Sequence, residues 1–177
     1  MKVVKADLDS FKKNLKLFDK EISDSEKINN TLDSFTSDLS NKFSGDAYKA
    51  ISDKINVFKE SNLARQKTSS ELKSKISAAL DSLSSYMDGY SYLDTEELDE
   101  LKVQRTNCQN NYNNILSAIN NTRNIFNLVS LKAQLASLES ELKELDKLIE
   151  KLEGLPAADA AAFAGIDGVS FGSGLTL

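Results

Sequence analysis

Apolar residues recur at helical spacing over most of the chain. The first run extends from Asp7 to Lys42 at steps of three or four residues, with one wider step across the polar segment 23–27. This period places a single apolar stripe on one long helix, with an exposed turn or a slight break at 23–27. A second run extends from Asp46 to Met87 and has a polar middle at 62–71. Two long helices joined by so short a connection are expected to lie antiparallel, as an αα-hairpin.

The predicted turn consists of Phe43, Ser44 and Gly45. Glycine readily adopts the positive φ that a tight reversal needs. Ser44 or Asp46 is suited to cap the helix that follows. We expect the aromatic ring of Phe43 to cover the open end of the hairpin.

A third helix is expected after the second one ends at Asp88 and Gly89, with Gly89 in the position that follows a helix C-cap. Asp94 and Glu97 have the spacing of a capping box, which predicts that the third helix begins here. The stretch 107–127 is rich in asparagine, a poor helix former, so it needs support from tertiary or partner contacts.

A heptad seam of leucine and isoleucine runs from Leu128 to Leu152. The seam fits either an intermolecular coiled coil or one arm of a second hairpin. Gly154 and Pro156 are expected to end this helix. Residues 155–177 are rich in alanine and glycine, with a short helix expected over 157–164. The segment as a whole is predicted to form a flexible tail or linker, or a strand that orders on a partner.

Composition removes several classes of function. The 177 residues include no histidine and one cysteine, which excludes Ser-His-Asp and Cys-His catalysis, imidazole zinc sites, intrachain disulfides and CxxC sites. The net charge of −5 argues against a nucleic-acid partner. Cys108 falls on an apolar helix face and is interpreted as a small buried hydrophobe. We predict no enzyme, no metal site and no cofactor.

The N-terminal residues lack the apolar stretch of a secretory signal peptide, and no run of 18 apolar residues predicts a transmembrane segment. Export from the cytoplasm would therefore require a route that uses no such leader.

The turn and its flanking helices resemble the WXG100 family of small helical hairpin proteins, which are substrates of the type VII (ESX-like) secretion system of Gram-positive bacteria. Phe43-Ser44-Gly45 stands where that family has Trp-x-Gly, and the segment SGDAYKA at 44–50 is similar to family sequence. The resemblance covers roughly residues 1–96, with phenylalanine in place of tryptophan. The longer chain is similar to the LXG-type targeting domains of type VII effectors or to the helical proteins that escort them.

The resemblance implies a secreted, non-enzymatic protein that leaves the cytoplasm by the type VII route. It implies small helical WXG100-like partners or a homo-oligomer, and recognition by the secretion ATPase. The family carries a Tyr-x-x-x-Asp/Glu export signal after its second helix. The two candidates for that signal here are Tyr90 with Asp94 and Tyr92 with Glu96.

The fold expected from all these features is all-α: an elongated helical bundle built on an N-terminal αα-hairpin. It would comprise a hairpin over 1–96, a helical or coiled-coil extension over 97–154, and the tail 155–177. Two helices cannot enclose a core, so their apolar stripes need a further layer, from this chain or from another. The candidate residues for a partner interface are Phe11, Phe18, Phe35, Phe58, Leu135, Leu142 and Ile149.

Two questions remain open at this level. The chain is either a complete secreted or escort protein, or the delivery domain of a larger toxin. A function of a different class is a cytoplasmic coiled-coil scaffold that uses the Leu128–Leu152 seam and has no role in export.

Overall fold

The computed structural model describes residues 1–166, and within that range the chain is predominantly helical. The all-α class and the N-terminal αα-hairpin are confirmed. The residues fall into two compact units. Among the described residues, one unit contains 6–86 and 160–166, and the other contains 1–5 and 87–159. The division between the units lies between Tyr86 and Met87, and the first five residues belong with the second unit.

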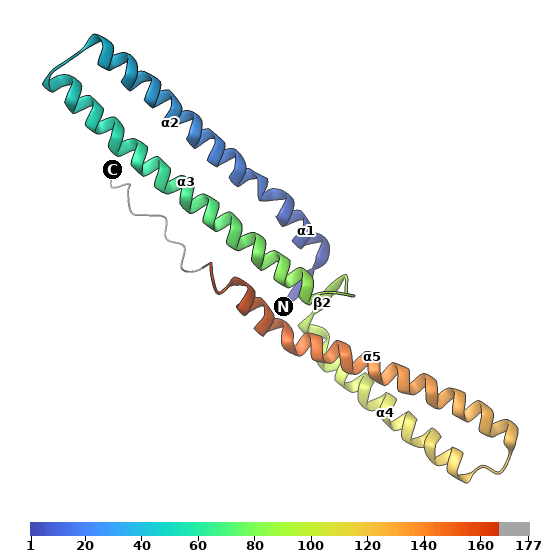
Figure 1. The fold of residues 1–177 in the computed structure, drawn as a ribbon. Helices are drawn as coiled ribbons and strands as arrows, with labels where there is room; N and C mark the ends of the chain where they lie inside the picture. The colour runs from blue at the N-terminus through green and yellow to red at the C-terminus, as the bar shows by residue number, and fades with distance from the viewer. Residues whose placement is uncertain (167–177) are drawn as a thin grey trace. The chain divides into compact units, whose positions relative to one another are not determined.

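The N-terminal hairpin (residues 6–86) consists of α1 (Lys5–Asn14), α2 (Lys16–Lys42) and α3 (Asp46–Tyr86). Helices α2 and α3 run side by side from the turn (Figure 1). The segment 23–27 is fully helical, and the interruption lies at Leu15 instead. There the amide N–H of Leu15 donates to the Lys12 carbonyl at 3.2 Å. This tighter i to i−3 bond marks a short 3₁₀-like turn between α1 and α2.

A small antiparallel sheet joins the first residues of the chain to the segment after α3. Strand β1 (Lys2–Val4) pairs with β2 (Tyr92–Asp94), with Val3 opposite Leu93. The ladder extends beyond both strands, because Thr95 N–H donates to the Met1 carbonyl at 2.8 Å and Lys5 N–H donates to the Ser91 carbonyl at 2.9 Å. Strands this short leave almost no periodic signal, so the sequence pattern missed them.

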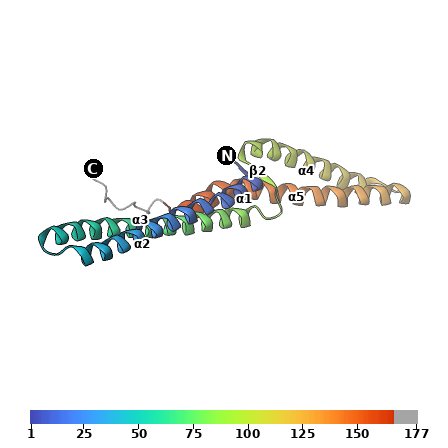
Figure 2. The same cartoon turned by 90° about the horizontal axis from the view of Figure 1, so that it is seen from above.

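The C-terminal hairpin consists of α4 (Leu98–Asn121) and α5 (Ile125–Phe163), which follow a 3₁₀ turn, η1 (Thr95–Glu97). Both views show α4 and α5 side by side along the first part of α5 (Figures 1 and 2). The leucine seam is therefore one arm of a second hairpin within the chain. The turn is held by Asn124, whose side-chain oxygen accepts from Phe126 N–H at 3.0 Å and so caps α5.

Helix α5 does not end at Gly154 and Pro156 as predicted, but continues through both to Phe163. Leu152 and Leu155 are 1% and 0% exposed. Burial of two leucines contributes about 1.5–3 kcal/mol each, which is enough to offset a cost of about 3 kcal/mol for proline inside a helix. The tail is thus helical over residues 155–163, and the short helix expected over 157–164 is part of α5. Its last part, 167–177, lies outside the described residues.

Candidate partner-binding site

The turn of the N-terminal hairpin lies at the predicted position, between the end of α2 at Lys42 and the start of α3 at Asp46. Gly45 has a φ of +91°, a conformation that residues with a side chain rarely adopt. Its carbonyl accepts from Lys49 N–H at 3.1 Å, so Gly45 itself takes the N-cap position expected for Ser44 or Asp46. Phe43 does not cover the hairpin end, because its side chain is 61% exposed.

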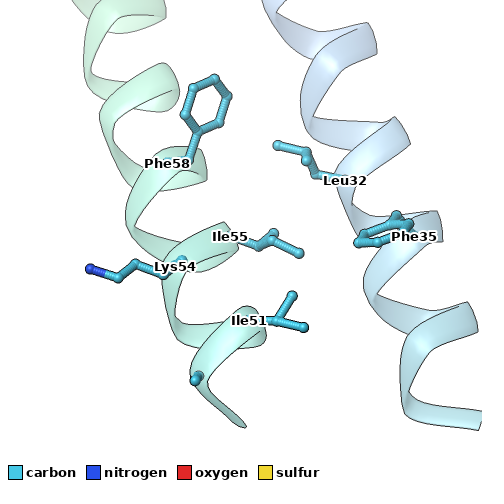
Figure 3. A pocket seen from close by; sticks show the side chains of 7 residues that line it. Leu32, Phe35, Ile51, Lys54, Ile55 and Phe58 are labelled. Carbon is cyan, nitrogen blue, oxygen red and sulfur yellow. The ribbon is translucent and has the colours of Figure 1, made fainter. Parts of the chain in front are cut away.

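An open apolar groove of about 630 Å³ lies near this turn, between α2 and α3. Its lining is aliphatic and aromatic apart from the stem of Lys54, and Figure 3 shows that the Lys54 ammonium points away from α2. Phe35 and Phe58 remain 50% and 56% exposed although both line the groove. We call this site the turn groove; it is lined by Leu32, Phe35, Ala50, Ile51, Lys54, Ile55 and Phe58.

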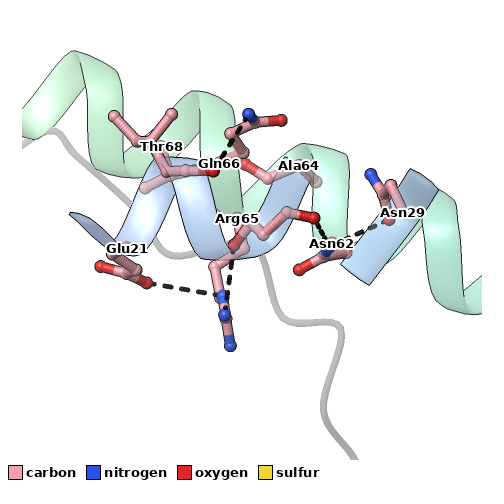
Figure 4. A network of polar contacts seen from close by, with 9 residues as sticks. Glu21, Asn29, Asn62, Ala64, Arg65, Gln66 and Thr68 are labelled. Carbon is pink, nitrogen blue, oxygen red and sulfur yellow. Dashed lines mark hydrogen bonds and ion pairs between the residues drawn. The ribbon is translucent and has the colours of Figure 1, made fainter. Parts of the chain in front are cut away.

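A buried polar layer lies farther from the turn, where the arms of the same hairpin meet (Figure 4). The Asn62 amide donates to the Ser25 carbonyl and to the Asn29 side-chain oxygen, both at 2.9 Å. Beside it, Arg65 forms an ion pair with Glu21 at 3.5 Å. Within the described residues, no buried side-chain nitrogen or oxygen lacks a hydrogen-bond partner. This layer explains the polar middle of the second sequence run: these residues bind the opposite helix.

Ion pairs between the arms continue on both sides of the polar layer. Lys59 pairs with Asp33 toward the turn, and Lys73 pairs with Asp19 away from it. At the far end of α3, Asp81 pairs with Lys12 of α1. These contacts fix the register of the two arms, and they fix where the turn groove opens.

The seven candidate interface residues are not gathered at one site. Phe35 and Phe58 come together in the turn groove, whereas Phe11 lies exposed on α1 and does not line it. Phe18 is half-buried. The three residues of the heptad seam, Leu135, Leu142 and Ile149, are half-buried along α5. Neighbouring groove residues Ile51 and Ile55 were not among the sequence candidates, although the helical repeat of α3 already included them.

The export-signal candidates lie in a turn and a strand. Tyr92 is in β2, and its hydroxyl donates to a Glu97 oxygen at 3.0 Å rather than to Glu96. This hydrogen bond raises the pKa of the Tyr92 phenol above its ordinary value. Asp94 caps η1 by accepting from Glu96 N–H at 3.1 Å. No hydrogen bond between these described residues joins Tyr90 to Asp94 or Tyr92 to Glu96, and sequence spacing did not identify Glu97 as the partner of Tyr92.

Polar contacts also cross the C-terminal hairpin. Arg105 pairs with Asp146 at 2.9 Å, and the Tyr112 hydroxyl donates to Glu139 at 3.2 Å. Between them Cys108 is buried, and burial raises the pKa of its thiol, so the unreactive protonated form prevails at neutral pH.

The described part of the chain holds no group of three or more His, Cys, Asp or Glu residues placed to bind a metal ion. Within residues 1–166, none of the helices combines the length and apolar character needed to cross a bilayer.

No protein-family model, curated protein or solved structure matches this chain. The resemblance to WXG100 proteins therefore stays a prediction from the turn motif and its flanking helices.

Proposed function

We propose that this chain is a non-enzymatic substrate or targeting domain of a type VII (ESX-like) secretion system, and that it binds a small helical partner at the turn groove. The observation that carries the proposal is the groove itself. Two helices leave Phe35 and Phe58 half-exposed beside a turn with the Phe-x-Gly pattern. In this proposal the protein acts by recognition and performs no chemistry.

The energetics favour a helical occupant. Each large apolar side chain contributes about 1.5–3 kcal/mol when fully buried. A second layer of helices would bury the groove and complete a four-helix arrangement. The polar layer at Asn62 holds the two arms in register and so keeps Phe35 and Phe58 together in the groove that a partner would have to match.

Export is the second part of the proposal. In this proposal the chain leaves the cytoplasm by the type VII route. The secretion ATPase recognises a signal near the end of α3, for which Tyr90, Tyr92, Asp94 and Glu96 are the candidates. The partial exposure of the Tyr92 side chain (45%) supports its availability to a receptor.

The binding part is tested by co-expressing the full chain with small helical proteins encoded beside it and measuring the mass of the purified complex. We expect the double variant Phe35→Ser/Phe58→Ser to weaken the complex at least tenfold. Val57→Ser is the matched control, because Val57 is also exposed on α3 but does not line the groove. Equal affinity of the two variants would contradict the groove as the binding site, and a stable homo-oligomer of the chain alone would replace the hetero-complex.

The export part is tested by secretion assays on Gly45→Ala, Tyr90→Ala and Tyr92→Ala in the native host. We expect less protein in the culture medium while the cytoplasmic pool remains folded by circular dichroism. Unchanged distribution of all three variants between cell and medium would favour a cytoplasmic scaffold that uses its helical faces without export.

A further inference from the structure

The tip of the C-terminal hairpin differs in charge from the rest of the chain. Residues 101–138 contain no aspartate or glutamate, although the whole chain has 27 acidic residues. The same segment contains four basic residues: Lys102, Arg105, Arg123 and Lys132. The end of an otherwise acidic protein is therefore positively charged.

Two of these four basic residues are neutralised by α5. Lys102 pairs with Glu153 and Arg105 pairs with Asp146, both far from the tip. Arg123 in the turn and Lys132 in the second turn of α5 form no ion pair with any residue from 1 to 166. The charges of Arg123 and Lys132 are therefore available to an anionic group outside the chain.

Large apolar side chains are exposed at the same tip. Ile125, Phe126 and Val129 are 75%, 87% and 66% exposed, and Leu116 of α4 is 39% exposed. Figure 1 shows that the connection between α4 and α5 forms the far end of this hairpin. Ile125 and Phe126 begin α5 directly after that connection, so they lie on a projecting end rather than in a groove.

We propose that this tip, residues 116–132, inserts shallowly into the surface of an anionic lipid bilayer. Exposed aromatic and aliphatic side chains at a convex end can enter the boundary between headgroups and acyl chains. Unpaired arginine and lysine beside them are attracted by anionic headgroups, and no carboxylate in the segment opposes this attraction. The asparagines around the turn are uncharged and suit the headgroup layer. Shallow insertion requires no membrane-spanning helix.

The other hairpin tip provides a matched control within the same molecule. Phe43 is also exposed beside a turn, at 61%. However, Asp38 and Asp46 offset Lys42 and Lys49 around it, so that end has no excess of positive charge to attract an anionic surface. An exposed phenylalanine is common to both tips, whereas an excess of positive charge around it occurs only at the tip of the C-terminal hairpin.

The absence of tryptophan from the sequence gives a direct test. Phe126→Trp and Phe43→Trp each introduce a single indole fluorophore at an exposed site of the full chain. With vesicles of phosphatidylglycerol and phosphatidylcholine, we expect the emission of the Phe126→Trp variant to shift to shorter wavelength and to be quenched by brominated lipid. We expect no shift for the Phe43→Trp variant. The response of the Phe126→Trp variant should be much weaker with pure phosphatidylcholine or at high salt.

Three further variants separate the contribution of charge from that of the apolar side chain in vesicle co-flotation. We expect Arg123→Gln and Lys132→Gln each to lower partitioning roughly fivefold, and Phe126→Ser to lower it roughly tenfold or more. Three results would overturn the proposal: no flotation of the unmodified chain, equal emission shifts of the two tryptophan variants, or equal binding to neutral and anionic vesicles. An emission shift of the Phe126→Trp variant caused by a helical protein but not by vesicles would also overturn it, in favour of protein docking.

Discussion

The N-terminal hairpin joins α2 to α3 through buried polar side chains, whereas the C-terminal hairpin joins α4 to α5 through a seam of leucines. In the first hairpin, Asn29 and Asn62 bond to each other across the interface at 2.9 Å. In the second, leucines recur along α5 and Leu152 is fully buried near its C-terminal end. Both hairpins also carry ion pairs between their arms.

This difference between the hairpins distinguishes interactions that stabilise the fold from interactions that select one register of the two helices. Apolar burial supplies most of the favourable free energy of folding, but a uniform leucine seam does not choose one register over another. A buried amide pair contributes little net free energy, yet any shifted register would leave its donors and acceptors unpaired. The N-terminal hairpin therefore has a well-defined register, but its apolar face is only partly buried. This combination suits a hairpin that completes its core with a partner.

The largest effect is expected from removing apolar volume in the C-terminal hairpin. Leu152→Ala creates a cavity at a site that is 1% exposed and should lower the free energy of unfolding by about 2–5 kcal/mol. Leu135→Ala, at a half-buried position of the same helix, is the control and should cost clearly less. Chemical denaturation followed by circular dichroism measures both. Equal losses of unfolding free energy for Leu152→Ala and Leu135→Ala would contradict the expectation that the fully buried end of the seam contributes most to the stability of this hairpin.

A smaller effect is expected from the polar layer of the N-terminal hairpin. Asn62→Ala leaves the Ser25 carbonyl and the Asn29 oxygen without their donor, so it should lower the free energy of unfolding by about 1–3 kcal/mol. Asn56→Ala, at an exposed position of the same helix, should stay within about 0.5 kcal/mol of the unmodified chain. If both substitutions proved neutral in denaturant titrations, the polar layer would not hold the register.

The helices and the N-terminal turn could be read from the sequence because each depends on local signals. The apolar repeat predicts α3 within one residue of its observed end at Tyr86, and Gly45 marks the reversal. The helix end predicted at Pro156 was wrong, because the burial of Leu152 and Leu155 stabilises the helix by at least as much as the proline destabilises it.

The missed features depend on residues far apart in sequence. The pairing of β1 with β2, including the contact of Met1 with Thr95, joins segments that no periodicity connects. The opening of the turn groove is likewise a property of two arms together. The sequence named Phe35 and Phe58 as interface candidates, but only the antiparallel register brings them to one site.

The smallest expected effect is on the pH dependence of stability. It arises from the hydrogen bond that the Tyr112 hydroxyl donates to Glu139 in the C-terminal hairpin. This bond raises the pKa of the Tyr112 phenol above its ordinary value of 10.0. Below that value the phenol is protonated in both the folded and the unfolded chain, so the contribution of the bond is fully present. As pH rises further, the unfolded chain releases the proton first, and the contribution is lost as pH passes through the folded-state pKa.

Tyr112→Phe should therefore be slightly less stable than the unmodified chain at about pH 8, and the gap should narrow above about pH 10. Unfolding midpoints measured across this pH range check the expectation. Tyr92→Phe is a parallel case, because Glu97 raises the pKa of Tyr92 in the same direction. A constant gap across the pH range for Tyr112→Phe would mean that its hydroxyl does not link α4 to α5, and the arms would then be joined at that level by the leucine seam alone.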